Sequence, residues 1–338
     1  MPSRSSYSSA DGSKGDHVAT WRVWTALAVL YFVWGSTYLA IKVAIDSIPP
    51  LLMAAVRFVL AGGLLLAWAV PRGGAAADPI GWRQWVAAAI VGGALLLGGN
   101  GGVVLAEERG VPTGIVALIV ATVPLWMAVM DRVVTSTRLP TVAVVGLVLG
   151  FAGLALLVAG RSSGNTDLIG VGFVLTASFL WAAGSIYARR SALPKRAFVA
   201  SGMELLCGGI LLAVAGIISG ELSRVHPRDI TGDSVLALVY LIFIGSIVAY
   251  SAYVWLLGNA PLRLAGTYAY VNPVVAVFLG WAILSEPITA RTLVASAVIL
   301  IGVALIVTAR PVAEPVAPPT DAAPLEVRPV DRTEREPA

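Results

Sequence analysis

Apolar residues follow one another along this chain in long blocks that short polar stretches separate. We identify ten such blocks: 22–43, 50–70, 84–105, 112–130, 140–159, 168–188, 198–219, 235–257, 264–284 and 289–309. An α-helix needs roughly 20 mostly apolar residues to cross the hydrocarbon core of a bilayer. A helix also satisfies its backbone hydrogen bonds within one crossing segment. The pattern therefore predicts an all-α membrane protein with ten transmembrane helices.

The two ends of the chain lack such blocks. Residues 1–21 are rich in Ser, Gly and Asp, and residues 311–338 alternate Pro, Ala and charged residues. Neither end has enough apolar side chains to form a core, so we expect two disordered tails. The first tail also lacks the apolar stretch and the cleavage site of a signal peptide.

The first five blocks resemble the last five, in the same order. Four pairs of segments carry this resemblance: FVWGSTYLAIK (32–42) with FLWAAGSIYAR (179–189), EERGVPTG (107–114) with NAPLRLAG (259–266), PLWMAVM (124–130) with PVVAVFL (273–279), and GLVLGFAGLALLV (146–158) with ASAVILIGVALIV (295–307). A separation of 147 residues aligns Trp34 with Trp181 and Arg57 with Glu204. We interpret the chain as a duplication.

Each copy contains five blocks, and five is an odd number. The second copy therefore enters the membrane from the opposite side, which predicts two inverted five-helix repeats at 22–160 and 165–309. Inverted repeats of this kind are typical of secondary transporters, whose substrate site lies near the bilayer midplane between the repeats. The duplication thus indicates a carrier with a central site.

The distribution of charge sets the expected orientation. Charged residues are 12% of the chain, about half the share of a soluble domain. With the N-terminus inside, 16 of the 23 Lys and Arg residues lie on the inner side and 6 on the outer side. Positive loops favour the cytoplasm, so we expect both termini there. We interpret RRSALPKR (189–196) as a topology signal, and the basic residues form no stripe that would indicate nucleic-acid binding.

Polar and aromatic residues interrupt the first and sixth blocks near mid-depth. Trp34 and Tyr38 share one face of a helix, and so do Trp181 and Ser185 in the aligned block. Polar groups at this depth are costly against lipid, so they should face the bundle interior or a wet cavity. We predict that both faces line one central pocket. The alternative is that the Gly-Ser pair after Trp34 only permits close helix packing.

Further residues are candidates for the wall of this pocket. They are Asn100, Trp126, Ser246, Tyr250 and Asn272. The amide of Asn100 offers both donors and acceptors, which suits a zwitterionic ligand or an interhelical hydrogen bond. By depth, Tyr253 and Tyr268 are expected in the interfacial aromatic belt rather than in the pocket.

Two prolines and two charges also lie within the blocks. Pro124 and Pro273 occupy aligned positions, and each removes an intrahelical hydrogen bond, which fits a hinge or a static bend. Arg57 and Glu204 fall in opposite leaflets, so we expect no direct ion pair between them. Snorkelling or capping of helix ends is expected ahead of substrate contact. Glu204 is the one candidate for proton coupling.

The sequence carries none of the motifs that would indicate an enzyme. HExxH, GxSxG and a phosphate-binding glycine loop are absent, and His17 and His226 lie in a tail and a loop. We therefore expect no catalysis, no cofactor and no metal site. The single cysteine, Cys207, excludes an internal disulfide framework.

Several of these segments resemble the EamA-type carriers of the drug/metabolite transporter superfamily. They are FVWGSTYLAIK, PLLMAAVRFVLAG (50–62), PVVAVFLGWAILSEPIT (273–289) and IGVALIV (301–307). The resemblance covers about residues 22–309, and the overall pattern is similar to bacterial exporters of aromatic amino acids and threonine. Both halves of such carriers often have an acidic residue where LSEPIT has Glu286, whereas the first half here has Thr137. At the end of a block, Glu286 suits a helix cap.

The resemblance implies an inner-membrane secondary transporter that exports amino acids, such as aromatic ones, threonine and methionine, and related metabolites by alternating access. Two other functions stay open: efflux of lipophilic drugs, and a lipid scramblase or membrane-embedded enzyme. The expected partners are a neutral or zwitterionic small molecule and the bilayer. The sequence does not define the oligomeric state, and a monomer is compatible with it.

Overall fold

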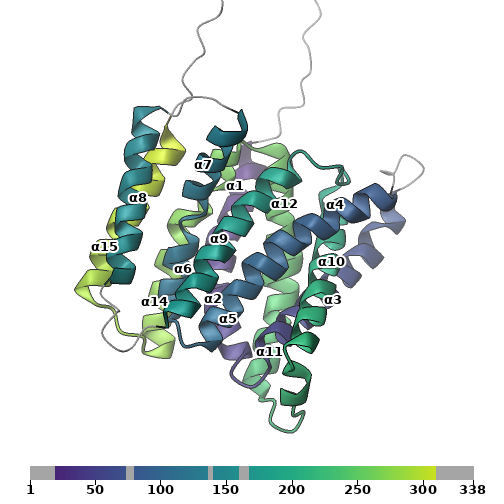
Figure 1. Ribbon diagram of the computed structural model, residues 1–338. Coiled ribbons are helices and arrows are strands. Elements are labelled where there is room, and N and C mark those ends of the chain that lie inside the picture. Colours follow the sequence, from purple (N-terminus) through teal and green to yellow (C-terminus); the bar gives the residue numbers. More distant parts are fainter. Residues whose placement is uncertain (1–19, 74–79, 136–139, 160–166, 310–338) are drawn as a thin grey trace, which may run out of the picture.

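The chain folds into one bundle of helices (Figure 1). The structure, a computed structural model, describes residues 20–73, 80–135, 140–159 and 167–309. In that part of the chain every regular element is helical. The predicted tails lie outside the described residues apart from Thr20 and Trp21, which begin the first helix, and Thr137 lies outside them as well.

The described elements of the first half are α1 (Thr20–Val29), the π-helical segment η1 (Leu30–Trp34), α2 (Gly35–Ala44), α3 (Pro50–Ala69), the 3₁₀ turn η2 (Pro71–Gly73), α4 (Trp82–Gly92), the π-helical segment η3 (Gly93–Asn100), α5 (Gly101–Glu108), α6 (Thr113–Val120), α7 (Val123–Thr135) and α8 (Thr141–Ala159). Several of these join end to end, so that α1, η1 and α2 form one continuous crossing.

The described elements of the second half are α9 (Leu168–Ala188), α10 (Ala197–Ile218), the 3₁₀ turn η4 (Glu221–Arg224), α11 (Gly232–Tyr240), the π-helical segment η5 (Leu241–Val248), α12 (Ala249–Asn259), α13 (Leu262–Ala265), α14 (Tyr268–Leu284) and α15 (Ala290–Thr308). Side-chain caps define several starts. Asp167 accepts from the N–H of Ile169, and Thr289 accepts from that of Thr292.

In the described part of the chain, seven helical stretches are long and apolar enough to cross a membrane: Thr20–Ala44, Pro50–Ala69, Trp82–Glu108, Thr113–Met130, Leu168–Ala188, Ala197–Ile218 and Gly232–Asn259. Three shorter apolar helices cover Thr141–Leu156, Val271–Leu284 and Ala290–Ile306. Each of these segments overlaps one of the apolar blocks in the sequence. The all-α prediction is therefore confirmed, and the chain has the helices of a membrane protein.

Two pairs of helices pack along their lengths, α3 with α10 and α8 with α15 (Figure 1). In the first pair, a Cβ added to Gly62 would lie 2.5 Å from the backbone nitrogen of Leu206. Reciprocally, a Cβ added to Gly209 would lie 2.7 Å from the backbone nitrogen of Val59. Gly62 and Gly209, and Val59 and Leu206, occupy positions aligned in the sequence repeat. The two contacts are therefore equivalent under the duplication.

The second pair repeats this arrangement. A Cβ on Gly153 would lie 2.9 Å from the backbone nitrogen of Ile299, and one on Gly302 would lie 2.5 Å from that of Gly150. These positions also correspond under the alignment of the two halves. Only glycine permits backbones to approach this closely. Each pair therefore joins a helix of the first half to its counterpart in the second.

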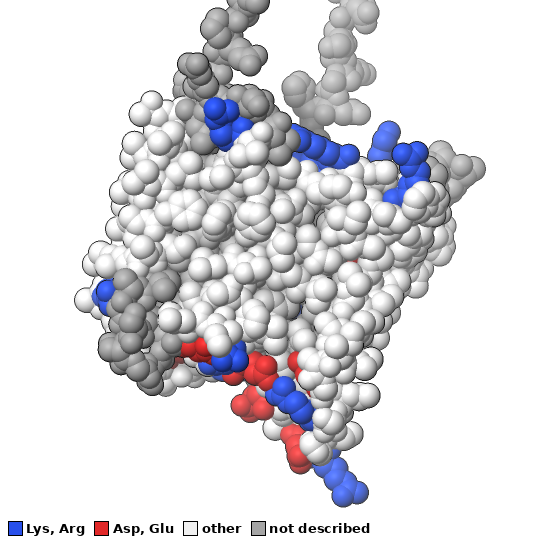
Figure 2. All heavy atoms as spheres, in the orientation of Figure 1, with Lys and Arg blue, Asp and Glu red and all other residues white. Residues whose placement is uncertain are grey.

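The two ends of the bundle differ in charge (Figure 2). One end, which we call the basic end, carries Lys and Arg from the loops next to α3, α4, α9 and α10. The opposite end, the mixed-charge end, carries acidic and basic side chains together. Helix α1 begins and α15 ends at the basic end (Figure 1). The first described helix thus starts, and the last one ends, at the same end of the bundle.

Candidate functional site

A cavity of about 60 Å³ lies in the middle of the bundle. Its wall consists of Trp34, Thr37, Tyr38, Ile41, Arg57, Phe58, Leu96, Gly99, Asn100, Val103, Val120, Val123, Ala177, Ser178, Trp181, Gly245, Tyr250, Tyr268 and Asn272. These residues come from both halves of the chain. The space holds a few water molecules and is smaller than typical ligand pockets of roughly 300–1,000 Å³. The cavity is therefore too small for a typical ligand in this conformation.

The structure brings six of the nine predicted substrate-binding residues to this wall. They are Trp34, Tyr38, Asn100, Trp181, Tyr250 and Asn272. Trp126, Ser185 and Ser246 are not part of the wall. Ser246 accepts a hydrogen bond from the wall residue Arg57, and Ser185 Oγ lies 2.7 Å from the hydroxyl of Tyr253. Trp126 instead packs against Phe151 and Phe179.

Three π-helical segments reach the cavity, and each contributes to its wall. Segment η1 ends at Trp34, η3 contains Gly99 and Asn100, and η5 contains Gly245. A π-helical turn shifts backbone carbonyls out of the regular hydrogen-bond ladder, and such turns occur frequently at functional sites. The indole Nε1 of Trp34 lies 3.4 Å from one of these carbonyl oxygens, on Gly245.

Asn272 joins α14 to the carbonyls of η1. With its amide oriented to donate, the side-chain nitrogen lies 3.1 Å from the carbonyl oxygens of Leu30, Tyr31 and Tyr268. This arrangement explains why a polar amide stands near the middle of an apolar block. It fixes the position of η1 from the other half of the chain.

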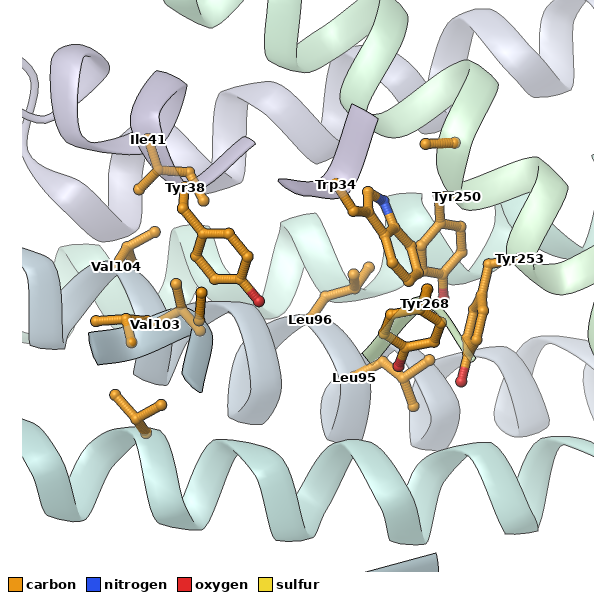
Figure 3. Close-up of a cluster of buried hydrophobic side chains, with 14 of the residues drawn as sticks. Trp34, Tyr38, Ile41, Leu95, Leu96, Val103, Val104, Tyr250, Tyr253 and Tyr268 are labelled. Atoms are coloured by element: carbon orange, nitrogen blue, oxygen red, sulfur yellow. The ribbon is translucent and has the colours of Figure 1, made fainter. Parts of the chain in front are cut away.

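Four aromatic rings pack against one another beside the cavity, and three of them, Trp34, Trp181 and Tyr268, belong to its wall. The ring of Trp34 contacts Trp181, Tyr253 and Tyr268 at centroid distances of 5.6, 5.0 and 5.1 Å. Trp34, Tyr253 and Tyr268 gather at one end of the buried side chains, together with Tyr250 (Figure 3). Edge-to-face pairs of this kind stabilise a cluster by roughly 0.5–1.5 kcal/mol each. We call Trp34, Trp181, Tyr253 and Tyr268 the aromatic cluster.

The prediction that Tyr253 and Tyr268 lie in the interfacial belt is wrong. They are 1% and 3% exposed, and both contact Trp34. The hydroxyl of Tyr253 accepts a hydrogen bond from Trp181 Nε1 at 3.2 Å and lies 2.7 Å from Ser185 Oγ. The hydroxyl of Tyr253 therefore finds its partners inside the bundle rather than at the membrane surface.

Arg57 reaches the cavity from α3. The side chain is 3% exposed, its Nε donates to Ser246 Oγ at 2.8 Å, and its guanidinium carbon lies 4.6 Å from the centroid of the Phe58 ring. Nη1 is buried and has no hydrogen-bond partner among the described residues. The expectation that Arg57 snorkels to the membrane surface is therefore wrong, because the side chain points inward.

Glu204, which aligns with Arg57 in the repeat, lies just behind the wall. It is 1% exposed, and its Oε2 accepts a hydrogen bond from the hydroxyl of Tyr250 at 2.7 Å. It does not snorkel either, because burial and this hydrogen bond keep it in the interior. No ion pair between Arg57 and Glu204 is present among the described residues, as their expected depths require.

The two prolines occupy different local structures. Pro124 is the second residue of α7, directly after the turn that separates α6 from α7. Pro273 lies inside α14, one residue after Asn272. The nearby Trp126 contacts the rings of Phe151 and Phe179 at 5.2 and 5.5 Å. Pro124 therefore stands at a break between two helices, whereas Pro273 lies within a continuous helix.

Carboxylates of the second half cap helices of the first half at the mixed-charge end. The carboxylate of Glu286 accepts from the N–H groups of Thr113 and Gly114, at 2.8 and 3.3 Å. Glu221 accepts from Leu51 and Leu52 N–H at 3.2 and 3.0 Å. Both carboxylates therefore lie at positive helix N-termini. Burial raises the pKa of Glu221, and the bonds to the two N–H groups oppose this increase.

Glu107 is a buried group that the sequence analysis did not single out. Its side chain is 0% exposed, and neither carboxylate oxygen has a hydrogen-bond partner among the described residues. Lys42 Nζ donates instead to the backbone oxygen of Glu107 at 2.9 Å. The apolar block was assigned to end at residue 105, which placed Glu107 in a loop. The described residues hold no cluster of three His, Cys, Asp or Glu side chains suited to a metal ion.

Comparison with known proteins agrees with this architecture. The model of the EamA-like transporter family matches residues 21–159 and again 168–308. YedA, described as an uncharacterized inner membrane transporter of Escherichia coli strain K12, is 41% identical over 298 residues, which cover 86% of this chain and 94% of YedA. A solved crystal structure of another protein, 22% identical, has a TM-score of 0.61 and covers 84% of this chain and 95% of its own, so it shares the fold.

More distant relatives extend the comparison. A probable amino-acid metabolite efflux pump of Salmonella typhimurium is 26% identical over 282 residues, which cover 80% of this chain and 89% of the pump. A WAT1-related chloroplastic protein of Arabidopsis thaliana is 29% identical over 293 residues, 85% of this chain and 70% of that protein. Matches to one family model over both halves, together with these relatives, show that the chain belongs to the EamA-like transporter family.

Proposed function

We propose that this chain is a secondary transporter of a bacterial inner membrane that exports amino acids and related small metabolites by alternating access. The observation that carries the proposal is the small cavity between the two halves, lined by aromatic rings and one cationic side chain. Membership of a transporter family gives the reaction class. The geometry of the cavity supports this space as the place where a solute is held.

The ten-span inverted repeat is part of this proposal. In α3 and α10, Gly62 lies against Leu206 whereas Gly216 lies against Leu52, so the two aligned helices run antiparallel. Antiparallel packing of equivalent helices supports a two-fold axis in the plane of the membrane. The two matches to one family model support the same interpretation. We assign 22–160 and 165–309 to the two repeats.

Orientation follows from the ends of the bundle. The basic end should face the cytoplasm, because cytoplasmic loops of membrane proteins carry an excess of Lys and Arg. Helix α1 begins and α15 ends at that end, which supports two cytoplasmic termini (Figure 1). The mixed-charge end then faces the outside.

Alternating access requires a closure on each side of the cavity. The aromatic cluster closes the cytoplasmic side. On the outer side, Tyr38 lies near Ile41, Val103 and Val104, away from the aromatic cluster (Figure 3). Contacts between the halves continue beyond it, such as the hydrogen bond that Ser234 Oγ donates to the carbonyl oxygen of Val43 at 2.8 Å. The conformation therefore fits an occluded state, and transport requires each closure to open in turn.

The substrate class rests on chemistry and on one relative. Apolar and aromatic walls with a few polar groups suit a small zwitterion whose side chain is apolar. The relative described as a probable amino-acid metabolite efflux pump supports this class. Efflux of lipophilic compounds is the second candidate, and the ring surfaces of the aromatic cluster favour it. A membrane-embedded enzyme or scramblase is the third, without a specific observation in its favour.

Counterflow in proteoliposomes tests these candidates. Vesicles loaded with unlabelled threonine, methionine or phenylalanine should take up the same labelled amino acid faster than protein-free vesicles. Dye movement without amino-acid exchange would instead support drug efflux. Movement of labelled lipid alone would support a scramblase and contradict the proposal.

A further inference from the structure

The cavity contains a buried cation whose hydrogen bonds are incomplete. Of the guanidinium nitrogens of Arg57, Nε is used by Ser246, whereas Nη1 is buried without a partner among the described residues. The two ion pairs found in that part of the chain are Arg109 with Asp167 and Arg224 with Glu108, and none of these residues lines the cavity. A buried charge without a counter-ion is costly. A ligand with a negative group would remove that cost.

Glu204 does not supply this negative group. It is the aligned residue of the other repeat, but its carboxylate accepts from Tyr250 and it is not part of the wall. Gly245 leaves room beside the guanidinium, since a Cβ there would lie 3.2 Å from Arg57 Nη2. Arg57 itself belongs to the cavity wall.

An unpartnered acceptor lies on the same wall. Asn100 Oδ1 is buried and has no hydrogen-bond partner among the described residues. An ammonium group carries three N–H donors and no acceptor, so it complements this oxygen. A donor on one side and an acceptor on another define the two polar ends of a zwitterion.

We propose that Arg57 binds the carboxylate of a zwitterionic amino acid and that Asn100 Oδ1 accepts a hydrogen bond from its ammonium group. The amino-acid side chain then lies against the rings of the aromatic cluster. Guanidinium binds carboxylate through parallel N–H bonds, which gives specificity for this group. This inference rests on the proposed function and names the groups that recognise the substrate.

The assignment predicts which group of the substrate each of the two residues binds. Removal of a charge-assisted hydrogen bond in a buried site weakens binding by roughly tenfold to a hundredfold. An amino-acid amide lacks the carboxylate, so wild-type protein should bind it that much more weakly than the acid. In Arg57→Gln most of the difference in affinity between the acid and the amide should disappear, and in Arg57→Lys part of this difference should return.

Titration calorimetry of the purified full-length protein tests this assignment. The probes are threonine, methionine and phenylalanine, their amides, and 3-phenylpropionate, which has a carboxylate without an ammonium group. Asn100→Leu should weaken the binding of phenylalanine and leave the affinity for 3-phenylpropionate unchanged. Arg72→Gln is the matched control, because Arg72 is exposed and contacts Trp68, through its carbonyl oxygen and its ring, far in sequence from any residue of the wall.

The possible outcomes separate this inference from the proposed function. Equal binding of acids and amides by wild type would contradict the role of Arg57 while leaving amino-acid transport intact. Binding of 3-phenylpropionate without any amino acid would contradict the proposed substrate and retain the carboxylate site. An equal loss for acid and amide in Arg57→Gln would assign Arg57 to the fold instead. Binding of no probe by wild type would overturn both.

Discussion

The paired helices and the cavity wall use the same duplicated sequence in opposite ways. Where α3 meets α10, Gly62 and Gly209 make equivalent contacts, so the repeat is preserved in the packing. At the cavity, the aligned residues Arg57 and Glu204 differ in charge and in partner. Symmetry thus governs the contacts that hold the halves together and is lost where a ligand would lie.

This difference has a physical reason. Two copies of one helix pack well across a two-fold axis, because one complementary surface serves both partners. A zwitterionic solute has no two-fold symmetry, so a site that recognises it must place different groups on its two sides. The comparison predicts that changes at the paired helices affect stability, whereas changes at the wall affect transport.

The largest effect is expected for Trp34→Ala, at the centre of the aromatic cluster. The change removes three ring contacts, so transport should fall roughly tenfold to a hundredfold. Trp126→Ala is the matched control, since Trp126 belongs to a separate cluster with Phe151 and Phe179. Counterflow normalised to the amount of folded protein measures both. An equal loss of transport in the two variants would contradict the assignment of Trp34, but not Trp126, to the cavity wall.

The next effect concerns the paired helices. In Gly62→Ala the new methyl group would lie 2.5 Å from a backbone nitrogen, so one helix must shift, at a cost of about 1–3 kcal/mol in the free energy of unfolding. Gly209→Ala should have a similar cost, because its contact is equivalent. Thermal unfolding in detergent measures these changes.

Gly63→Ala is the control for the two glycine variants. A Cβ at Gly63 meets nothing within 4 Å, so the substitution should leave stability unchanged or slightly higher. Unequal costs at Gly62 and Gly209 would contradict the equivalence of the two contacts.

A smaller effect is expected for Ser246→Ala. Ser246 accepts from Arg57 Nε at 2.8 Å and positions the guanidinium from outside the wall. Its loss should raise the apparent KM for an amino acid by roughly three- to tenfold and leave the maximal rate and the unfolding temperature nearly unchanged. An equal effect on an amino-acid amide would argue against a role in orienting Arg57.

The smallest effect should come from Asp167, on the scaffold at the mixed-charge end. Its hydrogen bond with Arg109 lowers the pKa of Asp167 below the usual 3.8. A depressed pKa stabilises the folded state above 3.8, and this contribution is lost as the pH falls through the folded value. Asp167→Asn should therefore show a smaller loss of thermal stability between pH 5 and pH 3. An identical pH profile would contradict the role of this pair.

Much of the architecture could be predicted because its signals are local. Long apolar blocks require helices in a bilayer, and the alignment of Trp34 with Trp181 placed both rings at one depth. The structure brings them to 5.6 Å. Polar groups at mid-depth were a sound guide to the wall, since water or protein must satisfy them.

The rest depends on three-dimensional packing that spacing does not reveal. Depth calculated from an ideal helix placed Tyr253 and Tyr268 near the surface. The π-helical segment η5 precedes Tyr253, and a turn precedes α14, which begins at Tyr268, so neither residue follows the ideal helix assumed in that calculation. The direction of Arg57 depends on Ser246, a residue 189 positions away in sequence. Glu107 was missed because a carboxylate next to a loop is normally solvated.

The central claim is that the cavity opens to each side in turn. Ser47 and Thr231 join the two halves at the mixed-charge end, where their hydroxyl oxygens lie 3.5 Å apart. In a background with Cys207→Ala, the pair Ser47→Cys and Thr231→Cys should form a disulfide under oxidation and hold this end closed. Counterflow of the labelled amino acid, with disulfide formation verified by mass spectrometry, is the measurement. The account predicts that oxidation abolishes exchange and that reduction restores it, whereas full exchange by the cross-linked protein would contradict it.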